Sequence, residues 1–167
     1  MKYRRLHPEE LDSLREDFVQ FLAANSLPAD DWIKLKKEMP DQAEKMIEMF
    51  SDLVWDKVLG NVKYLETRTQ QELRVVEFED NTINMIVLKI TSEDMDFTSP
   101  EHIRSISEGN VDLMSHGLEV LTGNRDYRAD KKMEVFAMME SGSRPCKEVF
   151  WLSIKKMIPA DNSAPAS

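Results

Sequence analysis

The sequence of 167 residues has one cysteine, few glycines and no long apolar run. Cys146 has no second cysteine to form an internal disulfide with, which favours a reducing compartment. The five glycines form neither GxGxxG nor GxxxxGK[ST], so the standard phosphate-binding loops are absent. The longest apolar stretch, residues 83–90, is too short to span a bilayer as a helix. Residues 1–10 lack the apolar core of a signal peptide, and we therefore expect a cytoplasmic protein.

The sequence also lacks an excess of positive charge. Its 22 Lys and Arg residues are outnumbered by 31 Asp and Glu residues, which gives a formal net charge of -9. Nucleic acids and anionic membranes both attract proteins through clustered basic side chains. We therefore expect neither a nucleic acid nor a membrane as a partner. Hydrophobic residues make up 41% and charged residues 32%, which is typical of a globular protein.

Helical periodicity dominates the N-terminal part of the sequence. Pro8, followed by two glutamates, predicts the start of a helix that extends to about Asn25-Ser26, before Pro28. A short helix is predicted over residues 31–39, with Asp30 as its N-cap. A third helix is predicted over residues 41–59, where apolar side chains recur at helical spacing. Its apolar stripe comprises Ala43, Met46, Ile47, Phe50, Leu53, Val54 and Val58.

The middle of the sequence changes to a strand pattern. Strands are predicted over residues 62–67, 73–79 and 83–91, and a fourth is possible over residues 118–122. The third strand is apolar on both faces, which favours a position between other strands. In the second strand, apolar side chains also point both ways, which indicates either two buried faces or a bulge. Further helices are predicted from Pro100, over 130–140 and over 149–158.

This order of elements predicts an α+β fold. It consists of N-terminal helices, a mostly antiparallel sheet of three to four strands, and C-terminal helices. We expect a single domain over residues 1–158, because the length suits one domain and no linker interrupts it. Residues 159–167 have no core-forming side chains and are predicted to be a disordered tail.

No catalytic, cofactor-binding or metal-binding residue is predicted. His7, His102 and His116 are widely spaced, and none lies in a zinc motif. Whether His102 and His116 meet nearby carboxylates in a pocket depends on the fold. Cys146 has basic neighbours but no nearby histidine to act as its base, so we interpret it as inert. The 11 methionines lie mostly in apolar stretches, and we interpret them as core filling rather than as a binding groove.

Acidic residues provide the candidate partner-binding surface. The third predicted helix carries five carboxylates spaced three or four residues apart, which places them along one stripe. A loop over residues 93–96 holds three more, without the remaining ligands of a calcium loop. Both acidic groups are most simply solvated surface, and binding of a basic protein partner is the functional alternative. The candidate partner-binding residues are Glu44, Glu48, Asp52, Glu93, Asp94, Asp96 and the tryptophan of the second helix, Trp32.

Several local phrases resemble a family of small acidic bacterial proteins that has no established activity. The phrases are Met1-Lys2-Tyr3-Arg4-Arg5-Leu6, Phe50-Ser51-Asp52-Leu53-Val54-Trp55, Val62-Lys63-Tyr64-Leu65-Glu66 and Asp96-Phe97-Thr98. The resemblance implies a bacterial cytoplasmic setting and one domain, and it assigns no functional residue.

Three functions are consistent with these observations. The preferred hypothesis is a non-enzymatic interaction protein, an adaptor, regulator or accessory subunit that uses an acidic surface. The first alternative is a small enzyme or ligand-binding protein whose site is assembled from distant residues. The second alternative is an oligomeric structural protein, which an apolar strand at the edge of the sheet would favour. The sequence leaves the oligomeric state open.

Overall fold

The computed structural model describes residues 1–158, and the predicted tail at 159–167 lies outside the described residues. The chain divides into two compact units, Met1–Asn61 and a second unit that begins at Val62. This division does not test the prediction of one domain over residues 1–158, which stays a prediction. The two units are described separately below.

The first unit contains four helices. The helix predicted from Pro8 is divided at Leu14, which has non-helical backbone angles. The next helix begins at Ala29, after Pro28 at the N-cap position. Pro40 both ends that helix and begins the long one, because a first helical residue needs no backbone donor. The helices are α1 (Pro8–Ser13), α2 (Arg15–Ala24), α3 (Ala29–Glu38) and α4 (Pro40–Asn61).

Aromatic side chains form the core of the first unit. Phe50 of α4 is 2% exposed, and its ring lies 5.0 Å from that of Phe18 and 5.4 Å from that of Phe21. Trp32 of α3 packs edge-on against Phe18 at 5.3 Å. These contacts join α2, α3 and α4 through ring packing.

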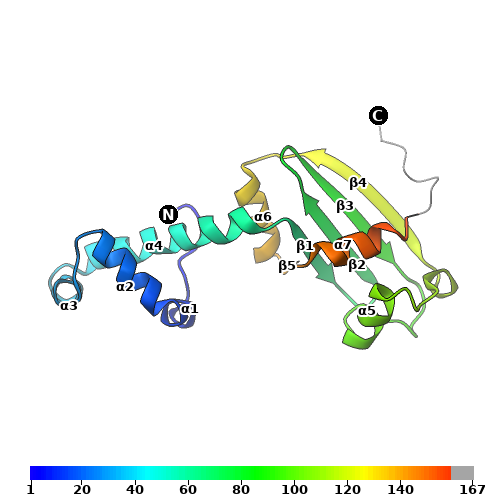
Figure 1. The fold of residues 1–167 in the computed structure, drawn as a ribbon, viewed down its shortest axis with the longest axis horizontal. Coiled ribbons are helices and arrows are strands. Elements are labelled where there is room, and N and C mark those ends of the chain that lie inside the picture. Colours follow the sequence, from blue (N-terminus) through cyan, green and yellow to red (C-terminus); the bar gives the residue numbers. More distant parts are fainter. Residues whose placement is uncertain (159–167) are drawn as a thin grey trace. The chain divides into compact units, whose positions relative to one another are not determined.

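The second unit is built on a five-stranded antiparallel sheet in the order β4-β3-β2-β1-β5 (Figure 1). The predicted α+β fold is confirmed, but the predicted number of strands, three to four, is too low. The additional strand, Arg144–Pro145, is only two residues long and has no period that a sequence pattern could reveal. The longer strands are β1 (Tyr64–Arg68), β2 (Glu72–Phe78), β3 (Thr82–Lys89) and β4 (Glu119–Asp126).

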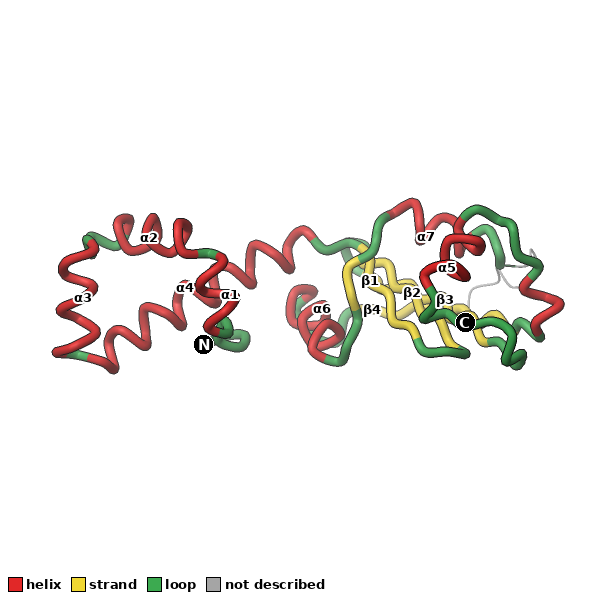
Figure 2. The backbone as a smooth tube through the Cα atoms, turned by 90° about the horizontal axis from the view of Figure 1, so that it is seen from below, coloured by secondary structure: helices red, strands yellow, loops and turns green. Residues whose placement is uncertain are grey.

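Helices cover the two faces of this sheet unequally. Figure 2 shows α5 and α7 on one side of the strands and α6 on the other. The first face carries the main core, with Leu73, Val75, Ile86 and Leu88 from the strands. The remaining elements are α5 (Pro100–Ser107), a 3-10 turn (Leu113–His116), α6 (Lys131–Glu140), β5 (Arg144–Pro145) and α7 (Glu148–Lys155).

The register of the strands explains their apolar pattern. β2 pairs with β3 without interruption, from Glu72 with Lys89 to Phe78 with Ile83. The second strand therefore has two buried faces and no bulge. β3 lies between β2 and β4, as its apolar pattern predicts. The predicted cap at the start of α5 is also confirmed, because the Ser99 side chain accepts a hydrogen bond from the His102 N–H.

Candidate functional site

The N-terminal residues 2–6, here called the N-terminal arm, lie along the carboxylates of α4. Asp52 accepts backbone hydrogen bonds from Lys2 at 2.7 Å and from Tyr3 at 2.9 Å. Asp56 accepts from the Tyr3 hydroxyl at 3.2 Å. Farther along the arm, Arg5 forms an ion pair with Glu44. A large part of the predicted acidic stripe therefore binds a basic segment of its own chain.

Apolar contacts hold the same arm in place. Tyr3 and Leu6 are buried, and the Leu6 N–H donates to the buried Ser51 hydroxyl at 3.1 Å. The Arg4 guanidinium lies 4.6 Å from the centre of the Trp55 ring, within the range of a cation–π contact. Arg4 also pairs with Glu10 at 2.8 Å, and this hydrogen bond lowers the pKa of Glu10 to about 2.

The remaining candidate residues are divided between the units. Glu48 and Trp32 are half-buried in the first unit, and Trp32 contributes to the aromatic core. In the second unit, Asp96 accepts hydrogen bonds from the Thr98 backbone and hydroxyl, which lower its pKa. Asp96 is thus a turn-forming residue. Glu93 and Asp94 are exposed, so they retain the accessibility that partner binding requires.

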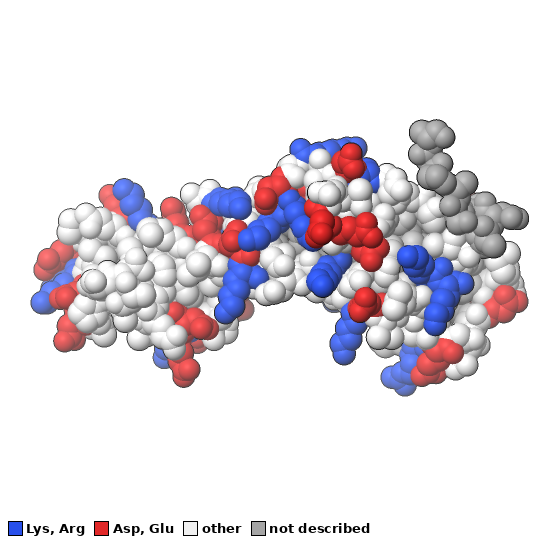
Figure 3. All heavy atoms as spheres, turned by 45° about the horizontal axis from the view of Figure 1, so that its top comes forward, with Lys and Arg blue, Asp and Glu red and all other residues white. Residues whose placement is uncertain are grey.

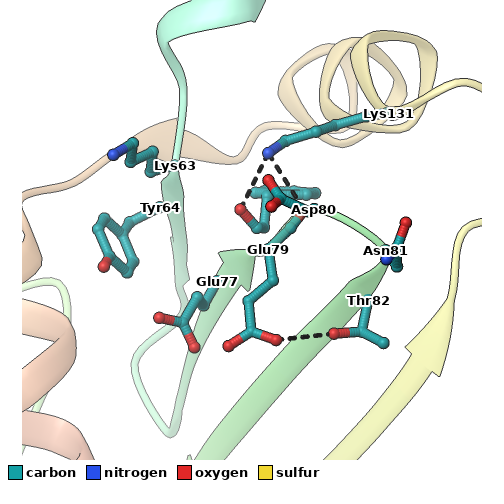
Figure 4. A pocket seen from close by; sticks show the side chains of 9 residues that line it. Lys63, Tyr64, Glu77, Glu79, Asp80, Asn81, Thr82 and Lys131 are labelled. Atoms are coloured by element: carbon teal, nitrogen blue, oxygen red, sulfur yellow. Dashed lines mark hydrogen bonds between the residues drawn. The ribbon is translucent and has the colours of Figure 1, made fainter.

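A polar hollow of about 610 Å³ lies at the β2–β3 turn. In Figure 4, the Lys131 amine reaches towards the turn and donates to the carbonyls of Phe78 at 3.0 Å and Glu79 at 3.2 Å. The Glu79 carboxylate accepts from the Thr82 hydroxyl at 2.9 Å. The Lys131 bonds hold the turn and α6 together, so Lys131 and Glu79 have a structural use in the hollow.

A second groove, of about 570 Å³, lies between α6 and the sheet. Met85 of β3 lines it together with Met133 and Met138 of α6. Met85 is 37% exposed, although it lies in the middle of its strand. The methionines were predicted to fill the core, since strand and helix patterns do not reveal which apolar face is only partly covered. Methionine side chains adapt to irregular apolar surfaces, so this groove is suited to binding.

Two arginines border this methionine groove. Arg125 donates to both carboxylate oxygens of Glu134, at 3.1 and 2.5 Å. Hydrogen bonds from Arg125 and from the backbone before α6 lower the pKa of Glu134 to about 2. The other arginine, Arg74, pairs with Glu72 at 2.9 Å. The charges at the rim are therefore balanced, and the groove itself favours an apolar occupant.

Cys146 and His102, the candidate nucleophile and metal ligand, each have a local environment that accounts for them. Burial raises the pKa of the Cys146 thiol to about 12, so the thiol is protonated at neutral pH. His102 Nδ1 accepts a hydrogen bond from the Asp96 N–H at 3.0 Å, so this nitrogen is engaged by a nearby backbone group. Within residues 1–158, no group of three or more His, Cys, Asp or Glu side chains is arranged to hold a metal ion.

The surface charge is mixed on the face drawn in Figure 3, where acidic and basic side chains are interspersed. A net charge of -9 therefore does not produce a uniformly acidic surface there. Among the described residues, no helix has the length and apolar character needed to cross a membrane.

Comparisons with known proteins identify a family but no activity. No curated protein matches the chain, and no solved structure matches it. A family model described as a family of unknown function (DUF6495) matches residues 1–159, which include the N-terminal arm, the sheet and the methionine groove. The chain belongs to this family of unknown function.

Proposed function

We propose that this protein is a non-enzymatic interaction protein that binds an apolar segment of a partner protein in the methionine groove. The exposure of Met85 is the observation that carries the proposal, because a side chain that is 37% exposed in the middle of a strand leaves apolar surface for a partner segment to cover. The two methionines of α6 allow the groove to adapt to its occupant.

The paired side chains elsewhere favour this function over the enzymatic alternative. A general base or nucleophile must be positioned and must have a pKa suited to its task. Burial raises the pKa of the Cys146 thiol to about 12, and the Lys131 amine donates to backbone carbonyls. The pKa of Glu134 is about 2 because of its arginine partner. These groups are therefore not poised for catalysis, whereas the groove has exposed apolar surface that a partner segment can bind.

Affinity purification from the native cells, followed by mass spectrometry, tests the proposal. Ala137 lines the groove and is exposed on α6, so Ala137→Glu places a charge there without disturbing the core. Ala23→Glu makes the same change on exposed α2 and serves as the matched control. We expect a stoichiometric partner with the wild-type chain and with Ala23→Glu, and its loss with Ala137→Glu. Equal recovery from all three proteins, or no partner from the wild type, would contradict the proposal.

We also propose, as a second candidate, that the acidic loop over residues 93–96 binds a basic protein partner. Charge reversal on α4 is an unsuitable test, because Asp52 and Glu44 hold the N-terminal arm. Glu93→Lys combined with Asp94→Lys changes exposed carboxylates instead. If a basic partner binds this loop, the double variant reduces its recovery at low salt, whereas Glu16→Lys does not. Unchanged recovery would exclude the loop as the docking site.

A further inference from the structure

The two edges of the sheet differ in how they are protected. β5 is two residues long and contains Pro145, and short strands with proline are typical of edges that do not pair with other chains. β4 is eight residues long and pairs with β3 along its whole length without a bulge. Its central residues, 120–124, contain neither charge nor proline. β4 therefore lacks the usual protection of an edge strand.

Within residues 1–158, the backbone groups on the outer side of β4 have no backbone partner. The Glu79 N–H donates to the Thr82 carbonyl, and the Ile90 N–H donates to the Gln71 carbonyl. Because hydrogen-bonded and non-hydrogen-bonded pairs alternate along an antiparallel ladder, these two bonds fix which residues of β3 point their backbone groups at β2. Even-numbered residues of β3 thus face β2, and odd-numbered residues face β4. By the register of β3 with β4, Val120, Thr122 and Asn124 direct their N–H and C=O groups away from the sheet. No other backbone hydrogen bond reaches β4 from elsewhere in residues 1–158.

The strand is complementary to itself in one antiparallel register. If Thr122 pairs with Thr122 of a second copy, Val120 pairs with Asn124, so all three outward residues find backbone partners. The same register places Glu119 opposite Arg125 and Leu121 opposite Gly123. Arg125 also pairs with Glu134, so at each end of the uncharged centre Glu119 of one copy lies beside an ion pair of the other. A shift by two residues would instead place Leu121 opposite Arg125.

Side-chain packing favours the same register. Leu121 is 43% exposed, and the space above Gly123 is open, since a Cβ added there would meet no atom within 4 Å. Gly123 is also the cross-strand neighbour of Met85 in β3. In the paired sheet, Leu121 of the second copy lies over Gly123 and beside Met85. Each copy thus covers part of the exposed apolar surface of the other.

We propose that two copies of this chain form a dimer in which their β4 strands pair antiparallel, centred on Thr122, to make one continuous sheet. The occupant of the edge is a second copy because the backbone phase and the fit of Leu121 to the open space at Gly123 agree in the register centred on Thr122. The inference does not depend on a partner in the methionine groove, although Leu121 of the second copy and such a partner both contact the surface around Met85.

Sedimentation of the full chain over a wide range of concentrations tests the dimer, with circular dichroism to check folding. Thr122 is exposed, so Thr122→Lys and Thr122→Glu preserve the monomer. Each variant alone places like charges opposite each other, and we expect its dimer dissociation constant to rise about five- to tenfold. An equal mixture places opposite charges together and restores dimers. Val149→Lys, which adds a charge at an exposed position on α7, leaves the mass unchanged.

The same substitutions at Asn124 test the register. Asn124 faces Val120 of the second copy, so Asn124→Lys and Asn124→Glu are not rescued by mixing. A wild-type chain that stays at its monomer mass of 19.4 kDa at every concentration would overturn the proposal. A dimer that Thr122→Lys leaves intact, or variants that mixing at position 122 fails to rescue, would also overturn it.

Discussion

In the first unit, the carboxylates of α4 hold the N-terminal arm, whereas in the second unit a carboxylate of α6 holds the loop that precedes its own helix. The first arrangement joins residues about fifty positions apart, and the second joins Glu134 to neighbours such as Ala129. The core also differs, because aromatic rings dominate around Phe50 and aliphatic strand residues dominate around Leu88. Acidic residues in this protein are thus structural in two different ways.

The largest expected effects come from the cores. Phe50→Ala in the first unit and Phe97→Ala in the second remove rings that are 2% and 0% exposed. Each should lower the free energy of unfolding by about 3–5 kcal/mol, because the side chain is lost and a cavity remains. Urea unfolding followed by tryptophan fluorescence and by circular dichroism measures this. The prediction of one domain requires both variants to shift a single transition, and two separate transitions would contradict it.

A smaller effect is expected where the N-terminal arm meets α4. Asp52→Ala leaves two backbone N–H groups, those of Lys2 and Tyr3, without their acceptor. We expect a loss of about 1–3 kcal/mol in the free energy of unfolding and faster amide exchange in the arm. Asp94→Ala, at an exposed loop position, should change stability by less than about 0.5 kcal/mol. Equal effects of the two substitutions would show that the arm contributes little.

The two arginine–glutamate pairs predict a difference in pH dependence. The pKa of Glu134 and that of Glu10 are both lowered from 4.5 to about 2. A carboxylate whose pKa is lowered in the folded state stabilises the protein at pH values above its ordinary pKa. This stability is lost as the pH falls from 4.5 towards 2. The side chain of Glu134 is 10% exposed and that of Glu10 is 37% exposed, so solvent screens the second pair more.

We therefore expect Glu134→Gln to flatten the acid limb of the stability curve more than Glu10→Gln does. Thermal unfolding midpoints, measured from neutral pH down to about pH 3, provide the comparison. A steeper acid limb in Glu134→Gln would contradict the assignment of this carboxylate. An identical curve for the two variants would show that burial does not distinguish the pairs.

The smallest expected effect on stability concerns Cys146. Burial raises its thiol pKa to about 12, so very little thiolate exists at neutral pH. Alkylation of the native chain should be much slower than alkylation of the chain unfolded in urea, and Cys146→Ser should leave the fold unchanged by circular dichroism. Equal alkylation rates in the two states would contradict the burial of this side chain.

The local residue pattern was sufficient to predict most of the helices and strands, but it was insufficient to predict the candidate site. The apolar stripe of residues 41–59 predicted α4 to within two residues at each end, because a long helix repeats its signal. The two-sided pattern of β3 predicted its place between other strands. The fourth strand was expected to end at residue 122, yet β4 continues to Asp126 because pairing with β3 outweighs local preference.

The candidate site depends on contacts between distant segments, which the local residue pattern does not predict. The spacing of the α4 carboxylates correctly indicated one face of the helix but could not reveal that residues 2–6 bind there. The prediction that Trp32 and the acidic residues bind a partner stays a prediction. The methionine groove depends on the distance between α6 and the sheet, which no periodicity encodes.

The sequence by itself determined most of the secondary structure, the α+β class and the absence of phosphate-loop motifs, because these follow from the spacing and type of neighbouring residues. Tertiary structure decided which carboxylates are occupied, which apolar face remains half covered and which strand lies unprotected at the edge. The physical reason is that burial, pairing and exposure depend on contacts between segments far apart in the chain, and the strength of each contact depends on the surroundings that the fold creates.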